Sequence, residues 1–255
     1  MTDKNITKTK KLLIPFFTAG FPALDSTTGI IESFDEAGVD YIEIGLAHSD
    51  ALADGPVIQK ASHQALLNGI NTSKLFEQIS KIKVKNSKLI LFSYYNPLLA
   101  YGLEKLVRDW KAAGGSAILV PDLPYEESEE LLSLCSSVGL KLIFLIAPTS
   151  TEERIKKIAE ISEEFIYLVS VTGVTGARDK VSENLGTIIQ KIKSFNPEIK
   201  VVIGFGISGA EQALAATSQG ADGVVIGSAI VKLLEQKGGV QEATDLLLEI
   251  KKSLL

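Results

Sequence analysis

The stretch "SQGADGVVIG", Ser218–Gly227, decides the fold, because it joins a helix end, a glycine turn and a buried strand in one short run. The same theme recurs as "EAGVDYIEIG" at Glu36–Gly45, "AAGGSAILVP" at Ala112–Pro121 and "SVGLKLIFLI" at Ser137–Ile146. Glycine ends helices readily because it adopts the left-handed conformation without a steric cost. The runs that follow are apolar on both faces, which is typical of parallel strands covered by helices, so the repeats predict βα units.

Eight strand candidates of this kind lie along the chain. They are Leu12–Thr18, Tyr41–Gly45, Lys88–Ser93, Ala117–Val120, Lys141–Ile146, Ile166–Val169, Lys200–Ile203 and Gly223–Ile226. Amphipathic stretches such as "STTGIIESFDEAG" and "TEERIKKIAEIS" separate them and predict helices. Eight such units in 255 residues predict an α/β fold, a (β/α)8 TIM barrel with extra helices that forms a single domain over residues 1–255. A doubly wound open sheet is the alternative, but the even composition without a linker favours closure.

The composition bounds the functional classes. With 45% hydrophobic and 22% charged residues, the chain has enough apolar material for a sizeable core. A net charge of −5 without a basic block argues against nucleic acid or an anionic membrane as a partner. No apolar run approaches the roughly 18 residues of a membrane span, and the lone Cys135 excludes an intramolecular disulfide framework. We therefore expect a cytoplasmic protein without a metal site, in which Cys135 packs inside a helix.

Glycine loops at two strand ends predict a phosphate site. In a TIM barrel, function sits at the carboxyl ends of the strands. The last two strands lead into "GFGIS" at Gly204–Ser208 and "GSA" at Gly227–Ala229, and "TGVTG" at Thr172–Gly176 follows the sixth strand. Backbone N–H groups beside such glycines, at a helix start, can approach an anion closely. Ordinary helix caps are the alternative interpretation.

Two carboxylates and a set of aromatic residues mark the same end of the barrel. Glu43 lies between Ile42 and Ile44, and a dry unpaired carboxylate costs several kcal/mol. It is therefore either paired for structural reasons or a catalytic group with a raised pKa. Asp54, before Gly55, is either a turn former or a second functional carboxylate. Apolar side chains near the strand ends suggest a flat ligand, and they are Phe17, Phe92, Tyr94, Leu119, Tyr167 and Phe205. Together these groups suggest proton transfer on an aryl-bearing sugar phosphate.

A family resemblance sharpens this interpretation. The motifs "IPFFTAGFP", "YIEIG", "SDALADGP", "YYNP", "PDLP", "YLVSVTGVTGAR", "GFGIS" and "GSAIVK" occur in order from about residue 10 to residue 250. In that order they resemble the α subunit of tryptophan synthase. The resemblance implies an indole-3-glycerol-phosphate lyase, which cleaves its substrate by a retro-aldol reaction to indole and glyceraldehyde 3-phosphate. It also implies a pyridoxal-phosphate β subunit that receives the indole, in a heterotetramer of two α and two β chains, and no cofactor in the α chain.

The resemblance assigns roles to matching positions. Glu43 matches the catalytic acid–base group, and Asp54 matches the aspartate that accepts from the indole N–H. Tyr167 matches a tyrosine near the glutamate, and Thr175 matches a lid threonine. The phosphate cradle is matched by Gly176, Gly206, Gly227 and Ser228. The indole wall is matched by Phe17, Phe92, Tyr94, Leu119 and Phe205.

The partner-facing loop departs from the family pattern. The family usually has "GVPFSDPLADGP", whereas this chain has "GLAHSDALADGP", with Ala47, His48 and Ala51 at the changed positions and Asp50 kept. We expect these four residues to face the β subunit, and His48 to be a surface or interface residue rather than a third acid–base group. An alternative is a mainly regulatory subunit with weak activity of its own. Another phosphate-binding isomerase or aldolase is a third reading, but no strand-end lysine is available for a Schiff base.

Overall fold

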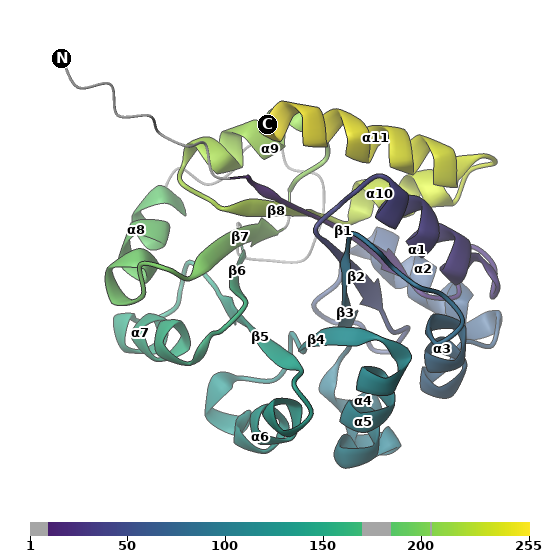
Figure 1. Ribbon diagram of the computed structural model, residues 1–255, viewed down its shortest axis with the longest axis horizontal. Coiled ribbons are helices and arrows are strands. Elements are labelled where there is room, and N and C mark those ends of the chain that lie inside the picture. The colour runs from purple at the N-terminus through teal and green to yellow at the C-terminus, as the bar shows by residue number, and fades with distance from the viewer. Residues whose placement is uncertain (1–9, 170–184, 205) are drawn as a thin grey trace.

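The computed structural model describes residues 10–169, 185–204 and 206–255, and in these ranges the strands form a closed barrel (Figure 1). Each strand pairs in parallel with the next along the chain, and β8 closes the ring by pairing with β1. The strands are β1 (Leu12–Thr18), β2 (Tyr41–Gly45), β3 (Lys88–Phe92), β4 (Gly115–Leu119), β5 (Lys141–Ile146), β6 (Phe165–Val169), β7 (Lys200–Gly204) and β8 (Gly223–Ile226). The predicted (β/α)8 barrel is confirmed, and the open-sheet alternative is wrong. The single-domain assignment to residues 1–255 stays a prediction.

Helices surround the barrel as an outer ring (Figure 1). They are α1 (Ser26–Glu36), α2 (Pro56–Leu67), α3 (Thr72–Ile79), α4 (Tyr95–Tyr101), α5 (Leu103–Ala113), α6 (Glu129–Ser137), α7 (Glu152–Ile161), α8 (Leu185–Phe195), α9 (Ala210–Ser218), α10 (Ser228–Leu234) and α11 (Gly239–Leu254), with a short 3-10 turn at Tyr125–Glu127. Pairs of helices follow β2, β3 and β8, which accounts for the predicted extra helices. Cys135 is buried in α6, as expected. Over the described part of the chain, none of the helices combines the length and the apolar character needed to cross a membrane.

The strand register determines which side chains face the barrel interior. Phe16 pairs with Glu43, and Glu43 pairs with Ile90, so these three side chains point to the same side of the sheet. The next residue, Phe17, points the other way and meets Phe34 of α1 edge-on at a ring-centroid distance of 6.2 Å. Because α1 lies outside the barrel, Phe16 and Glu43 face its interior.

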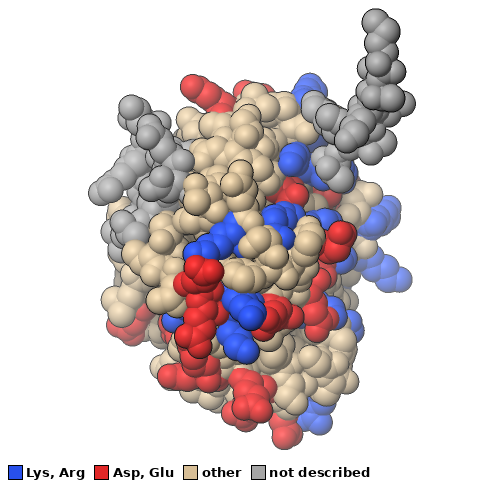
Figure 2. Space-filling model, turned by 90° about the vertical axis from the view of Figure 1, so that its left-hand side faces the viewer, with Lys and Arg blue, Asp and Glu red and all other residues tan. Residues whose placement is uncertain are grey.

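Opposite charges alternate over the face that carries α7 and α8 (Figure 2). Lys191 of α8 reaches Glu152 of α7 at 2.6 Å, and Lys193 reaches Asp222 at 2.7 Å. Lys193 and Asp222 are half-buried, whereas Glu152 is exposed, and surface pairs of this kind typically contribute about 0–1 kcal/mol each to stability. The stability of the fold therefore rests on its buried apolar core rather than on this surface.

Candidate active site

Glu43 is a buried carboxylate at the interior of the barrel. It lies on β2, two residues before the carboxyl end of the strand, and only 1% of it is exposed. Its Oε1 atom has no hydrogen-bond partner among the residues that the structure describes. Burial, together with the charge of Asp54, raises the pKa of Glu43 to about 8. Glu43 can therefore give and take a proton near neutral pH.

Asp54 is fixed by hydrogen bonds from Tyr94, which directly precedes α4, and from Gln59 of α2. The Tyr94 hydroxyl, just before α4, donates to Asp54 Oδ2 at 3.0 Å and accepts from the Ala53 N–H at 2.9 Å. Gln59 of α2 donates to the carbonyl oxygens of Asp54 at 2.9 Å and Ala51 at 3.2 Å. Burial raises the pKa of Asp54 to about 6, although the Tyr94 bond pulls it down. The carboxylate thus faces a buried site and does not cap α2, whose capping residue makes no side-chain cap bond.

Tyr167 completes the group of titratable side chains. It is 5% exposed, and burial, followed by the charges of Glu43 and Asp54, raises its pKa well above the ordinary value. Its ring occupies the space that a Cβ atom would need at Gly204, on the neighbouring strand β7. A side chain at position 204 would therefore displace Tyr167. Glu43, Asp54 and Tyr167 lie close enough to influence one another's titration.

An apolar wall lies beside Glu43. Phe92 pairs in register with Gly45 and with Leu119, so both apolar side chains face the interior. The rings of Phe16 and Phe92 meet edge-on at 5.3 Å, and Phe16 lies against Gly45, where a side chain would collide with it. The structure does not bring Phe17 into this group. Phe16 takes its place, because adjacent residues of a strand face opposite sides and only the pairing register tells which one faces inward.

The predicted phosphate residues lie at two adjacent strand ends. Val202 of β7 pairs with Gly223 of β8, so the loops that follow these strands are neighbours. Gly206 has a φ of 81°, which favours glycine, and Gly227 directly precedes Ser228 at the start of α10. Three further predicted residues lie outside the described part of the chain, namely Thr175, Gly176 and Phe205.

The predicted partner loop divides into buried and exposed residues. Ala47 and Ala51 are buried within the chain itself. Asp50 is exposed and accepts from the Ser49 hydroxyl at 2.7 Å. His48 is half-buried, and its ring centroid lies 5.3 Å from that of Tyr94. Only the His48 and Asp50 side chains of the four predicted residues thus offer surface to a partner.

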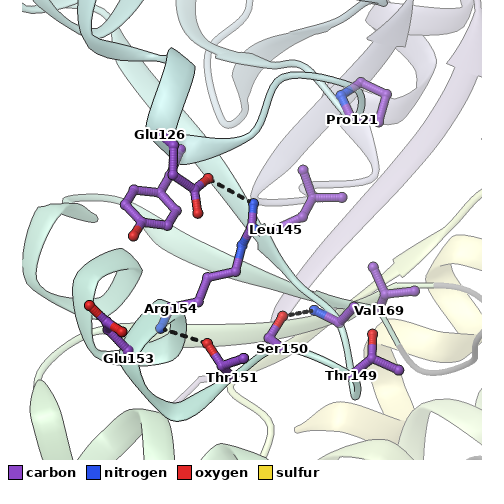
Figure 3. Close-up of a pocket in the computed structure, with 11 residues that line it drawn as sticks. Pro121, Glu126, Leu145, Thr149, Ser150, Thr151, Glu153, Arg154 and Val169 are labelled. Carbon is purple, nitrogen blue, oxygen red and sulfur yellow. Dashed lines mark hydrogen bonds and ion pairs between the residues drawn. The ribbon is translucent and has the colours of Figure 1, made fainter.

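A cavity of about 640 Å³ opens beside β5 and β6 (Figure 3). Leu145 of β5 and Val169 at the end of β6 line it, together with Thr149, Ser150 and Arg154. Arg154 pairs with Glu126 across it at 3.1 Å. Neither Glu43 nor Asp54 lines this cavity. Within the described ranges, the His, Cys, Asp and Glu side chains form no group of three or more that could hold a metal ion.

Known proteins resemble the chain over most of its length. The family model described as tryptophan synthase alpha chain matches residues 3–253. A tryptophan synthase alpha chain of Geotalea daltonii is 45% identical over 238 residues, covering 93% of this chain and 89% of the relative. One from Methanosarcina acetivorans is 41% identical over 249 residues, covering 97% and 90%.

Solved structures give the same result. Tryptophan synthase from Mycobacterium tuberculosis superposes with a TM-score of 0.88 at 32% identity, covering 97% of this chain and 93% of the other. A tryptophan synthase complex from Pyrococcus furiosus gives a TM-score of 0.85 at 32% identity, covering 95% and 98%. Sequence and structure agree over nearly the whole length, so the chain belongs to the tryptophan synthase alpha chain family.

Proposed function

We propose that this chain cleaves indole-3-glycerol phosphate to indole and glyceraldehyde 3-phosphate, with Glu43 as the acid–base group. The observation that carries the proposal is a carboxyl group, 1% exposed, whose Oε1 has no partner among the described residues and whose pKa is raised to about 8. Fold and family membership supply the reaction class, and the buried carboxylate supplies a group suited to it.

The two carboxyl groups have different roles because their pKa values differ. Near pH 7, Glu43, with a pKa of about 8, is mostly protonated, whereas Asp54, with a pKa of about 6, is mostly ionised. Glu43 donates its proton to indole C3, which places a positive charge on the ring nitrogen. The Asp54 carboxylate accepts from the N–H and stabilises this charge.

Bond cleavage then returns the proton to Glu43. The Glu43 carboxylate removes the proton from the glycerol hydroxyl beside the scissile bond, and a carbonyl forms at that carbon. The electron pair of the broken C–C bond restores the double bond of the indole ring and neutralises its nitrogen. One proton has been given and one taken, so Glu43 ends in its starting state.

The remaining residues orient the substrate. The indole ring packs against Phe92 and Leu119, and against Phe16 in place of Phe17. Tyr94 and Tyr167 border the carboxylates, and Phe205 and Thr175 keep the roles that family resemblance assigns. The phosphate binds to backbone N–H groups of the loops after β6, β7 and β8, at Gly176, Gly206, Gly227 and Ser228.

A β subunit is the proposed partner. Pyrococcus furiosus tryptophan synthase is described as an α2β2 complex, and its structure is similar to this chain with a TM-score of 0.86 at 34% identity. We propose the same assembly of two α and two β chains for this protein, in the cytoplasm, with pyridoxal phosphate held only by the β subunit. The partner-facing residues are His48 and Asp50 by their side chains, and Ala47 and Ala51 by their backbone.

Indole release from purified protein tests the catalytic assignment. We expect Glu43→Gln to lower the rate by about 100-fold or more, because general acid–base groups contribute that much. Glu36→Gln, an exposed carboxylate at the end of α1, is the matched control and is expected to retain full activity. Indole release by Glu43→Gln at the wild-type rate would contradict the role of Glu43.

The altered loop at Ala47, His48 and Ala51 suggests one alternative function. A mainly regulatory subunit would release indole negligibly by itself and in complex, yet change the rate of a β subunit. Measuring indole release with and without the β subunit separates the two functions. We favour the lyase because both carboxyl groups are kept and buried, with pKa values raised to about 8 for Glu43 and about 6 for Asp54.

A further inference from the structure

His48 lies beside the tyrosine that holds Asp54. Its ring and that of Tyr94 are 5.3 Å apart between centroids and inclined by 38°. Ring pairs that pack against each other have centroids roughly 4.5–7 Å apart, so this is a packing contact. His48 is half-buried and Tyr94 is 6% exposed, and the imidazole therefore covers one side of the phenol ring.

The Tyr94 hydroxyl makes two hydrogen bonds that depend on where its ring lies. It accepts from the Ala53 N–H at 2.9 Å and donates to Asp54 Oδ2 at 3.0 Å. Ring and hydroxyl move as one rigid unit about two torsions. A shift of the ring away from its present position would stretch both hydrogen bonds. Stretching the bond to Asp54 would change the pKa of that carboxyl group.

We propose that His48 is a positioning residue for Asp54: its ring packing keeps Tyr94 where the hydroxyl donates to the carboxylate. The proposal rests on the proposed function only for its catalytic consequence, since the hydrogen bond exists without substrate. Burial pushes the pKa of Asp54 up and the Tyr94 bond pulls it down, so His48 acts on the ionisation of Asp54 through Tyr94.

Ring packing, rather than imidazole charge, carries this effect. The groups around Asp54 are Tyr94 before α4, Glu43 on β2, Tyr167 on β6, and Gln59 on α2, which donates to the Asp54 carbonyl oxygen. Within the described ranges, the ring contact of His48 is with Tyr94, which in turn donates to Asp54. A phenyl ring at position 48 can fill the same space, whereas an alanine leaves the phenol ring uncovered.

Carbon-13 NMR titration of the Asp54 carboxyl group in the full chain tests the proposal without substrate, with Asp54→Asn to assign the signal. We expect His48→Ala to raise the pKa of Asp54 by up to about one unit, because a hydrogen bond to the charged form is weakened. His48→Phe is expected to titrate like the wild type. Tyr94→Phe is expected to raise the pKa too, and His48→Ala is expected to add nothing in that background.

Catalysis provides a second readout. Activity requires ionised Asp54, so the acid limb of the kcat/KM profile is expected to move to higher pH in His48→Ala and to return in His48→Phe. An unchanged Asp54 pKa in a folded His48→Ala protein overturns the proposal, as does an equal shift in His48→Phe. A chain that titrates as expected but releases no indole at any pH instead overturns the proposed function and leaves this inference standing.

Discussion

At the scale of single residues, Glu43 is placed where it lowers the stability of the fold. Its pKa is raised from 4.5 to about 8, so the folded chain holds this proton more tightly than the unfolded chain does. Below about pH 4.5, Glu43 is protonated in both the folded and the unfolded chain, so its raised pKa does not change the free energy of unfolding. Between pH 4.5 and 8, Glu43 is ionised in the unfolded chain but still protonated in the folded chain, so the free energy of unfolding falls as pH rises.

Glu43→Gln is therefore expected to stabilise the protein while it removes activity. Glutamine keeps the shape of the side chain but cannot ionise. The gain in free energy of unfolding is expected to grow from near zero at pH 4.5 to a ceiling on the order of 4 kcal/mol at pH 8 and above. Urea unfolding at pH 5, 7 and 9 measures it, with Glu36→Gln as the surface control. A gain of the same size at pH 5 and pH 9 would contradict the burial of a neutral carboxyl group.

The sequence predicts the kind of residue at the site better than its orientation. Glu43 and Asp54 were recognisable because a carboxylate in an apolar strand and one before Gly-Pro are both unusual. The sequence does not tell which of Phe16 and Phe17 faces the barrel interior, since both are aromatic. In the structure it is Phe17 that faces α1. Only pairing between β1 and β2 decides between them, and pairing is a property of strands far apart in the chain.

At the scale of secondary structure, apolar runs predicted the strands closely, and β4 shows where such patterns fail. The expected start was Ala117, because "GG" ahead of it is typical of a turn. The strand instead begins at Gly115, since the Trp110 ring fills the space of a side chain there and its Nε1 donates to the Ala117 carbonyl at 3.0 Å. A strand position that only glycine can occupy carries no apolar signal.

Asp35 is an anchor between elements that the sequence pattern does not reveal. It lies at the end of α1 and accepts the backbone N–H groups of Lys85, Asn86 and Ser87 at 2.9, 2.9 and 2.8 Å. Burial would raise the pKa of Asp35, but these bonds outweigh it and hold the pKa below its ordinary value. The carboxylate thereby ties α1 to the segment that leads into β3.

Asp35→Asn is expected to lower the free energy of unfolding by about 2 kcal/mol at neutral pH, because a charged acceptor of several N–H groups is lost. Since the folded pKa is depressed, this stabilisation is present above the ordinary value of 3.8 and is lost as pH falls through the folded value. Urea unfolding from pH 7 down to pH 3 measures the difference. Asp25→Asn, exposed and without a side-chain cap bond, is the control. A loss that stays constant down to the lowest pH would show that charge is not the cause.

At the scale of the whole molecule, Glu43 and Asp54 lie apart from the cavity that opens at the end of β5. Asp54 and Glu43 come from β2 and the loop after it, whereas the cavity of about 640 Å³ lies over β5 and β6. At the opposite end of the barrel, Tyr41 and Lys88 both donate to Glu164. The altered loop, in which Leu52 is 80% exposed, thus lies at the same end of the barrel as Glu43 and Asp54.

The loop with Ala47 and Ala51 leads to a prediction about affinity for the β subunit. Neither the Ala47 nor the Ala51 N–H donates a hydrogen bond to another residue that the structure describes, so proline at these positions removes no such bond. Proline lowers the conformational entropy of the unbound loop, which stabilises the ordered form by up to about 1 kcal/mol at each position. The double variant Ala47→Pro, Ala51→Pro is therefore expected to bind the β subunit about tenfold more tightly.

Titration of the β subunit, followed by indole release or by the change in β rate, measures this affinity. Ala53→Pro is the contrasting variant, because the Ala53 N–H donates to Tyr94 at 2.9 Å and proline abolishes that bond. It is expected to weaken indole release even with saturating β subunit, through loss of the support for Asp54. If the double proline variant binds and responds like the wild type, the loop is already ordered, and alanine at positions 47 and 51 does not weaken pairing.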